Sequence, residues 1–228
     1  MIEKDRSYEI LETKERVTAD NEKIANKTSA HLAENHCYFV NLMSSPGAGK
    51  TTTLTQIIKR LGNRYKIGVM EADTDSDVDA KTMEELGVRV IQLHTGGSCH
   101  MDADMTGRGL DAMGFQDLDL VFLENIGNLV CPAEFDVGEN LKLMILSVPE
   151  GDDKPLKYPL MFQVSDCLLI NKMDAAPVFD FNMDRLEDRV KELNPEMEIY
   201  PVSALKGTGF DIVCKRLSER IEEWRKTL

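Results

Sequence analysis

Short apolar runs recur along the whole sequence, and longer amphipathic stretches separate most of them. The apolar runs cover residues 38–43, 66–71, 88–93, 118–124, 141–148, 166–170 and 197–202. Runs of this length are typical of strands buried on both faces of a sheet. Residues with a helical period fall at about 52–62, 77–86, 100–113, 154–163, 182–193 and 209–226. This alternation predicts an α/β fold in which helices cover both faces of a mostly parallel, wound sheet.

The N-terminal residues 1–35 have a different character. They are polar, charged and helix-prone, and Ile10, Val17 and Ile24 are spaced seven apart with few apolar partners between them. We expect an extra N-terminal helical arm that packs on the sheet through one narrow stripe, followed by a single domain over 36–228. A partner-binding or dimer element is the alternative, but a helical seam needs a fuller heptad pattern.

A candidate phosphate loop follows the first apolar run and precedes a helix-like stretch. Its sequence, SSPGAGKT, covers Ser44–Thr51, and a strand, a glycine-containing loop and a helix in this order are typical of a P-loop NTPase fold. The glycines allow a tight curl, and the backbone N–H groups and the helix N-terminus attract anions. The common pattern begins with glycine, whereas Ser44 stands here; serine can make the turn if its φ stays negative. The expected nucleotide contacts are Pro46, Gly47, Ala48, Gly49, Lys50, Thr51 and Thr52.

A second segment, Asn171-Lys172-Met173-Asp174, predicts that the nucleotide is GTP. A carboxylate at Asp174 can accept hydrogen bonds from the guanine N1–H and the exocyclic amine, a donor pair that adenine lacks at that edge. Asn171 would hold the pocket and Lys172 would lie over the ring. A later Ser203-Ala204 pair would add a backbone N–H for the guanine carbonyl. An Asn-Lys-x-Asp segment alone is weak, but behind a phosphate loop it is a strong signal.

Acidic residues after the next strands predict a magnesium site and a nucleotide switch. Of the four aspartates at 73, 75, 77 and 79, we favour Asp73 and Asp79, which would join Thr51 and Glu124 around Mg²⁺. Gly127 would sense the γ-phosphate through its N–H, and Asp79 is the candidate that orients the attacking water. Lys50 and Thr51 complete the expected catalytic set. Because the sequence offers no evident arginine finger in cis, we expect slow turnover.

Cysteine and histidine side chains at the switch predict a soft-metal site. Cys99 and His100 stand together before a predicted helix, whose dipole would stabilise a thiolate. Cys131 follows the segment that contains Gly127, the expected nucleotide switch. Two sulfurs and one nitrogen suit Ni²⁺ or Zn²⁺ but leave one position of a tetrahedral site open. Water, Asp102 or a second copy of the chain could fill it, and a homodimer would do so by symmetry. Adjacent Cys-His without C-x-x-C spacing is otherwise more often structural.

The composition of the chain limits which partners it can bind and where in the cell it is expected. The chain has 228 residues and a formal net charge of -13, which argues against nucleic acid binding because the phosphate backbone favours cationic surfaces. Its five cysteines are an odd number and widely spread, as expected of reduced thiols; Cys167 and Cys214 fall on apolar faces and should be core residues. Without an apolar run long enough to span a membrane or a signal-peptide pattern, we expect a cytoplasmic protein.

Taken together, long blocks of the sequence resemble the HypB-type GTPases, the nickel-insertion accessory proteins of [NiFe] hydrogenase maturation. The resemblance runs from about Cys37 to the C-terminus and rests on NLMSSPG at 41–47, CHMDA at 99–103, ENIGNLVCP at 124–132 and EGDDKPLKYP at 150–159. It implies a homodimer, slow GTP hydrolysis, a nickel or zinc site at Cys99, His100 and Cys131, and the hydrogenase large subunit and other maturation accessory proteins as partners. Members of that family also share serine at the position of Ser44.

Two other functions remain open from the sequence. One is a zinc-regulated module in which metal only cements a GTP-dependent dimer. The other is the related urease nickel GTPase, which would predict a Cys-Pro-His metal motif; the chain instead has Cys99-His100 and a separate Val130-Cys131-Pro132.

Overall fold

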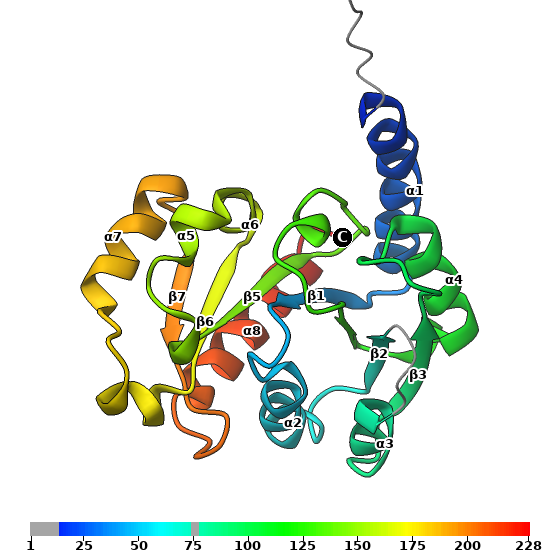
Figure 1. The fold of residues 1–228 in the computed structure, drawn as a ribbon. Helices are drawn as coiled ribbons and strands as arrows, with labels where there is room; N and C mark the ends of the chain where they lie inside the picture. The colour runs from blue at the N-terminus through cyan, green and yellow to red at the C-terminus, as the bar shows by residue number, and fades with distance from the viewer. Residues whose placement is uncertain (1–13, 74–77) are drawn as a thin grey trace, which may run out of the picture.

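A parallel sheet forms the centre of the molecule (Figure 1). The computed structural model describes the backbone of residues 14–73 and 78–228, and the side chains of 19–73 and 80–228. All seven predicted strands are confirmed, in the spatial order β3-β2-β4-β1-β5-β6-β7, and every neighbouring pair in this described sheet is parallel. The strands are β1 (Tyr38–Ser44), β2 (Ile67–Asp73), β3 (Arg89–His94), β4 (Leu120–Glu124), β5 (Leu141–Ser147), β6 (Cys167–Asn171) and β7 (Glu198–Pro201).

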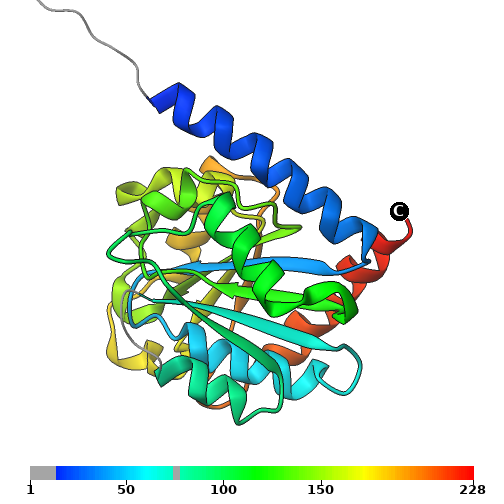
Figure 2. The ribbon, with the colours of Figure 1, turned by 90° about the vertical axis from the view of Figure 1, so that its right-hand side faces the viewer.

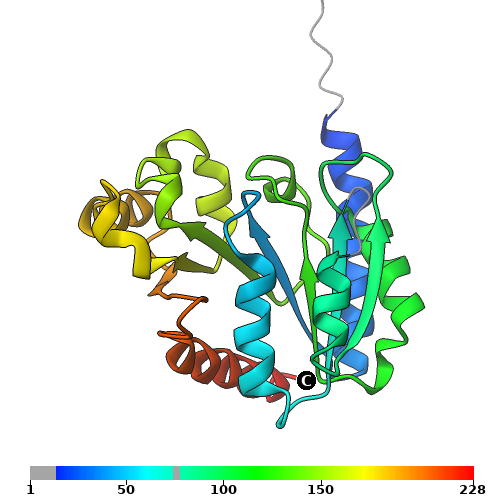
Figure 3. The ribbon, with the colours of Figure 1, turned by 60° about the horizontal axis from the view of Figure 1, so that its bottom comes forward.

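Helices cover both faces of this sheet, because successive strand residues point to opposite sides and both sides are apolar. On one face α2 (Lys50–Leu61), α3 (Val78–Glu84) and α8 (Phe210–Arg225) pack against alternate strand residues such as Val40 and Phe122 (Figure 3). On the other face lie α1 (Lys14–Glu34), α4 (Ala103–Met113), α6 (Pro159–Val164) and α7 (Met183–Leu193). Among the described residues, no helix is both long and apolar enough to cross a membrane.

Two predicted helices differ from those observed, and side-chain chemistry explains both differences. The predicted helix over 154–163 is two short helices, α5 (Lys154–Lys157) and α6, which meet at Tyr158 with φ -132° and ψ 54°. Pro159 lacks an amide hydrogen and disfavours helical backbone in the residue before it. The predicted helix at 100 begins only at Ala103, because the Asp102 side chain accepts the backbone N–H of Met105 and caps it.

The N-terminal helix α1 packs along α4 (Figure 2). The buried face of α1 consists of Asn21, Ala25, Thr28 and Leu32, which follow a helical spacing but are mostly small or polar. Ile24, from the predicted stripe, is half-buried. Ile10 and the side chain of Val17 lie outside the described residues. The division of the chain at residue 35 stays a prediction.

Candidate nucleotide and metal sites

The segment between β1 and α2 has the shape of a phosphate loop. Gly47 and Gly49 have φ of 74° and 98°, a left-handed conformation that residues with a Cβ rarely adopt. Ser44 keeps a negative φ, since His36 and Lys172 are the only non-glycine residues with positive φ in the described chain. The Ser44 hydroxyl donates to the carbonyl of Ser45 at 2.7 Å. The departure from the glycine consensus therefore leaves the loop intact.

The predicted guanine-binding segment lies directly against this loop. The Asn171 side chain is buried; its Nδ2 donates to the Ala48 carbonyl at 2.9 Å, and its Oδ1 accepts the backbone N–H of Ala204 at 3.0 Å. Lys172 Nζ donates to the Gly47 carbonyl at 2.6 Å. A Cβ at Gly49 would lie only 2.5 Å from Asn171 Nδ2, so glycine is needed there for close approach as well as for its φ. The fold thus joins two motifs that lie more than 100 residues apart in the chain.

Asp174 stands at the open side of this pocket. The Ser203 hydroxyl donates to its Oδ1, and this hydrogen bond is the main reason that the pKa of Asp174 lies below its usual value. The carboxyl group is therefore ionised at neutral pH and can act only as an acceptor. An ionised acceptor is what a guanine edge with two donors requires.

Carboxylates and a hydroxyl meet beside the phosphate loop. Thr51 Oγ1 donates to Glu124 Oε1 at 3.1 Å, and Lys50 Nζ lies 4.0 Å from the same oxygen. Glu71 is paired in register with Glu124 across β2 and β4, and both are nearly fully buried, at 3% and 4% exposure. Asp73 lines the same small cleft. This donor set of hard oxygens fits Mg²⁺.

One residue of this cleft was not among the predicted magnesium ligands, and one predicted ligand has a side chain outside the described residues. Glu71 was not predicted as a magnesium ligand, because it lies inside an apolar run that predicts a strand. It could have been found there, since a buried carboxylate in a strand is rare unless it is paired or binds metal. The side chain of Asp79 lies outside the described residues, so its predicted role stays a prediction. Thr52 and Pro46 are exposed on the rim of the loop.

The segment after β4 touches the phosphate loop at one end and the metal ligands at the other. A Cβ at Gly127 would lie 2.8 Å from Pro46 N and 2.9 Å from Pro46 Cα, so this glycine allows backbone to pack on backbone. Next along the chain, Asn128 Nδ2 donates to the Cys99 carbonyl at 3.1 Å, and Asn128 Oδ1 accepts the N–H of Val130 at 2.9 Å. The sequence did not indicate this role of Asn128.

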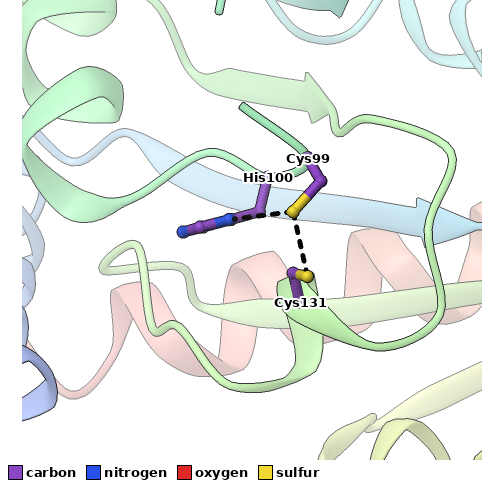
Figure 4. A group of neighbouring side chains, drawn as sticks. All are labelled: Cys99, His100 and Cys131. Carbon is purple, nitrogen blue, oxygen red and sulfur yellow. Dashed lines mark hydrogen bonds between the residues drawn. The ribbon is translucent and has the colours of Figure 1, made fainter. Parts of the chain in front are cut away.

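The three predicted soft-metal ligands come together (Figure 4). Cys99 Sγ lies 3.0 Å from Cys131 Sγ and 3.7 Å from His100 Nδ1, and one ligand atom from each residue lies within 4.8 Å of the others. The His100 ring stacks on Phe135 with centroids 4.1 Å apart. Partial burial lowers the pKa of His100, which favours the neutral imidazole that binds metal. Sulfur and nitrogen donors in this arrangement suit Ni²⁺ and Zn²⁺.

The expected thiolate at a helix start was wrong. The helix begins four residues after Cys99, at Ala103, and the pKa of Cys99 is raised, chiefly by the hydrogen bond that it shares with Cys131. Because metal binds the thiolate, metal entry here must displace a proton from this pair. The remaining cysteines, Cys37, Cys167 and Cys214, are buried core residues, as predicted for the last two.

A buried polar chain connects both sites to the loop after Cys131. Asn125 directly follows Glu124; its Oδ1 accepts the N–H of Met101 at 3.3 Å, and its Nδ2 donates to Asn41 Oδ1 at 3.1 Å. Asn41 Nδ2 in turn donates to Glu139 Oε1 at 3.3 Å, and Glu139 Oε2 accepts the N–H of Val137 at 2.9 Å. This chain of hydrogen bonds was not predicted, although Asn41 inside the first apolar run was a visible signal.

Glu139 should make the stability of the fold depend on pH. Burial raises its pKa to about 7, against an opposing effect of Lys142 and a reinforcing one of Asp136. In the unfolded chain this carboxyl ionises near its ordinary value of 4.5, so its contribution to stability is complete below that pH and is lost as pH rises through about 7. The loss is on the order of 3 kcal/mol. Urea unfolding of wild type and Glu139→Gln at pH 5 and pH 8 should show a smaller loss in the variant; equal losses would contradict this assignment.

Comparisons with known proteins agree with this geometry. The sequence profile of the CobW/HypB/UreG nucleotide-binding domain matches residues 38–201. Hydrogenase maturation factor HypB of Escherichia coli (strain K12) is 41% identical over 202 residues, which are 89% of this chain and 70% of that protein. The probable HypB of Methanocaldococcus jannaschii is 32% identical over 214 residues, or 94% and 97% of the two chains. Against the HypB of Azotobacter chroococcum, 42% identical, this chain spans 66% of the relative's length.

Solved structures show the same fold. The crystal structure of HypB from Helicobacter pylori in complex with nickel has a TM-score of 0.85 and 34% identity, and covers 90% of this chain and 96% of its own. HypB from Archaeoglobus fulgidus has a TM-score of 0.83 and 35% identity, over 89% and 99% of the chains. The chain therefore belongs to the CobW/HypB/UreG family of nucleotide-binding proteins and, within it, to the HypB-type hydrogenase maturation factors.

Proposed function

We propose that the protein is a GTP-hydrolysing metallochaperone that couples a nucleotide switch to nickel binding and inserts nickel during [NiFe] hydrogenase maturation. One observation carries this proposal: the segment from Glu124 to Cys131 contacts the phosphate loop through Glu124 and Gly127 and ends in a metal ligand. A change at the γ-phosphate can therefore reach the sulfur of Cys131 through this segment of eight residues.

In the nucleotide site, each part of the chain has a distinct role. The backbone N–H groups of the phosphate loop and the ammonium of Lys50 bind the phosphates, and Asp174 selects guanine. Thr51, Glu124, Glu71 and Asp73 are the residues that would hold Mg²⁺, which when bound neutralises charge on the β- and γ-phosphates. Asp79 remains the candidate that orients the attacking water. Turnover is expected to be slow, because the sequence offers no evident arginine finger in cis.

In the metal site, nickel is the cargo. Cys99, His100 and Cys131 supply three ligands, and we infer that a water or a second copy of the chain completes the set, with Zn²⁺ as a competitor. While GTP holds Gly127 against Pro46, Asn128 keeps Cys99 beside the segment that carries Cys131. Loss of the γ-phosphate releases this segment and separates the two sulfurs, so that nickel leaves.

The names of the relatives support nickel as the cargo and a hydrogenase as its destination. The Helicobacter pylori structure holds nickel, and proteins from Helicobacter hepaticus and Helicobacter pylori are named hydrogenase/urease maturation factors. For this chain we propose a homodimer that delivers nickel to the hydrogenase large subunit with other maturation accessory proteins. Its free thiols suit the reducing cytoplasm.

Nickel affinity should depend on the nucleotide, and Gly127→Ala should remove that dependence. The added methyl group would collide with the backbone of Pro46, which forces the switch segment off the phosphate loop. In wild type we expect nickel affinities with GDP and with a non-hydrolysable GTP analogue to differ by roughly 10-fold. In Gly127→Ala the difference should disappear, and GTP turnover should fall at least roughly 10-fold. Competition titration against a nickel chelator measures the first quantity and phosphate release the second.

A matched glycine substitution provides the control. Gly107 lies in α4, where a Cβ would meet only the Thr28 hydroxyl at 3.6 Å, so Gly107→Ala should keep both properties. If wild-type nickel affinity is the same with both nucleotides while metal still promotes dimerisation, the zinc-regulated dimer module becomes the better description and the carrier proposal is wrong.

A further inference from the structure

One side chain of the N-terminal helix contacts both loops that carry the metal ligands. Asn21 Oδ1 accepts the backbone N–H of Ala103 at 2.9 Å, and Asn21 Nδ2 donates to the carbonyl of Asp136 at 2.7 Å. These partners lie 82 and 115 residues away in sequence. The Asn21 side chain is 9% exposed, so it makes these bonds largely out of water, where an unmade hydrogen bond is costly.

The first of these bonds fixes the loop of Cys99 and His100. Ala103 is the first residue of α4, whose leading N–H groups have no partner within the helix. The Asp102 side chain already accepts the N–H of Met105. Because Ala103 is fully buried, the N–H of Ala103 needs an acceptor from another element. Asn21 supplies it. Because His100 lies three residues before Ala103, this bond fixes where the ligand loop ends.

The second bond fixes the loop of Cys131. Asp136 directly follows Phe135, whose ring stacks on His100, and its own side chain closes a turn by accepting the N–H of Gly138 at 2.7 Å. The carbonyl that receives Asn21 is therefore held in one orientation. One amide thus ties the C-terminal end of one ligand loop to the C-terminal end of the other.

We propose that Asn21 is a positioning residue of the metal site, so that helix α1 sets the separation of the two ligand loops and thereby the affinity for nickel. Asn128 joins the same loops through Cys99 and Val130, and Asn21 joins them through Ala103 and Asp136, which follow the ligands in the chain. The two amides together bracket the ligands. This inference rests on the proposed function only in taking Cys99, His100 and Cys131 as the nickel ligands.

The inference gives α1 a role beyond covering the sheet. A displacement of the helix by a fraction of a hydrogen-bond length would stretch one or both bonds of Asn21. The loops would then be free to separate, although none of the three ligands belongs to α1. Partners outside the immediate ligand shell commonly change metal affinity by roughly 10- to 100-fold when they are removed.

Three variants of the full-length protein test this role. Asn21→Ala removes both bonds. Asn21→Asp keeps an acceptor for Ala103 but turns an oxygen toward the Asp136 carbonyl, so it loses only the second bond. Thr28→Val is the control, because Thr28 is as buried as Asn21 on the same face of α1 and the change leaves both bonds of Asn21 in place.

Two readouts report on the site itself. The first is the nickel dissociation constant with the thiolate-to-nickel charge-transfer spectrum; we expect the dissociation constant to rise roughly 10-fold in Asn21→Ala, to rise also in Asn21→Asp, and to stay unchanged in Thr28→Val. The second needs no metal: the equilibrium between the Cys99 and Cys131 thiols and oxidised glutathione, which yields one protein disulfide and two reduced glutathiones. Looser loops should lower this equilibrium constant by a similar factor.

The outcomes separate this inference from the proposed function. Wild-type values in Asn21→Ala for both readouts overturn the inference, and so does an equal loss in Thr28→Val, which would mean general helix packing. If nickel binding survives Cys99→Ala, the proposed ligand set is wrong, and the thiol equilibrium alone then decides whether Asn21 positions the loops. A changed spectrum in Asn21→Asp with an unchanged thermal midpoint supports positioning over folding.

Discussion

Replacing Asp174 by asparagine should convert a GTP-binding protein into one that prefers xanthosine triphosphate. The carboxylate of Asp174, ionised beside Ser203, would accept the two donors of guanine. An amide offers one acceptor and one donor instead, which match the N1–H and the C2 carbonyl of xanthine. Sites built on such paired polar groups reject the mismatched ligand by roughly 10⁴-fold or more. Competition between the two triphosphates for the purified variant, measured with a fluorescent nucleotide analogue, gives the preference directly.

An exposed aspartate six residues further along the chain provides the control for this exchange. Asp180 is exposed, so Asp180→Asn should bind GTP as wild type does. Unchanged selectivity for GTP in Asp174→Asn would contradict the assignment of the guanine pocket, although the phosphate loop would remain assigned.

Cys131→Ala should abolish most of the nickel affinity and leave nucleotide binding intact. Its sulfur lies 3.0 Å from that of Cys99, and removing one of three protein ligands forfeits a large share of the binding free energy of a thiolate site. We expect the nickel dissociation constant to rise roughly 100-fold or more. Equilibrium dialysis with nickel, followed by metal analysis, measures affinity and stoichiometry in the same experiment.

A second cysteine provides the control, because it shows whether the loss of nickel comes from removing any thiol or from destabilising the fold. Cys214 lies on the buried face of α8 and is 5% exposed, so Cys214→Ala should lower the free energy of unfolding and keep the nickel stoichiometry. If Cys131→Ala loses nickel but still forms a dimer with GTP, the carrier function is supported. Loss of dimerisation alone, with nickel retained, favours a structural role for the metal.

The sheet could be predicted because burial on both faces imposes a simple pattern. All five residues of β6 are buried and the first four are apolar, so the apolar run in the sequence marks the position of the strand. Helix ends were predicted less well, since they depend on single side chains. Asp102 delays the start of α4, and Pro159 divides the predicted helix over 154–163.

The candidate sites could be predicted where function requires a fixed order of residues. The phosphate loop and the segment of Asp174 are contiguous motifs, and Cys99, His100 and Cys131 carry chemistry that is recognisable by residue type. Glu71, Asn125 and Asn128 act through partners from distant parts of the chain, and no local pattern reveals such a pairing. The same limit hid Asn21, which lies in a polar helix where asparagine is common.

The bonds of Asn171 and Lys172 to the phosphate loop have a kinetic consequence. They are bonds of the chain to itself that hold the base-binding and phosphate-binding segments together, so little conformational entropy should be lost when a nucleotide binds. Association should then be fast and nearly equal for di- and triphosphate. Diphosphate and triphosphate would then differ mainly in their dissociation rates, on which the segment after β4 would act.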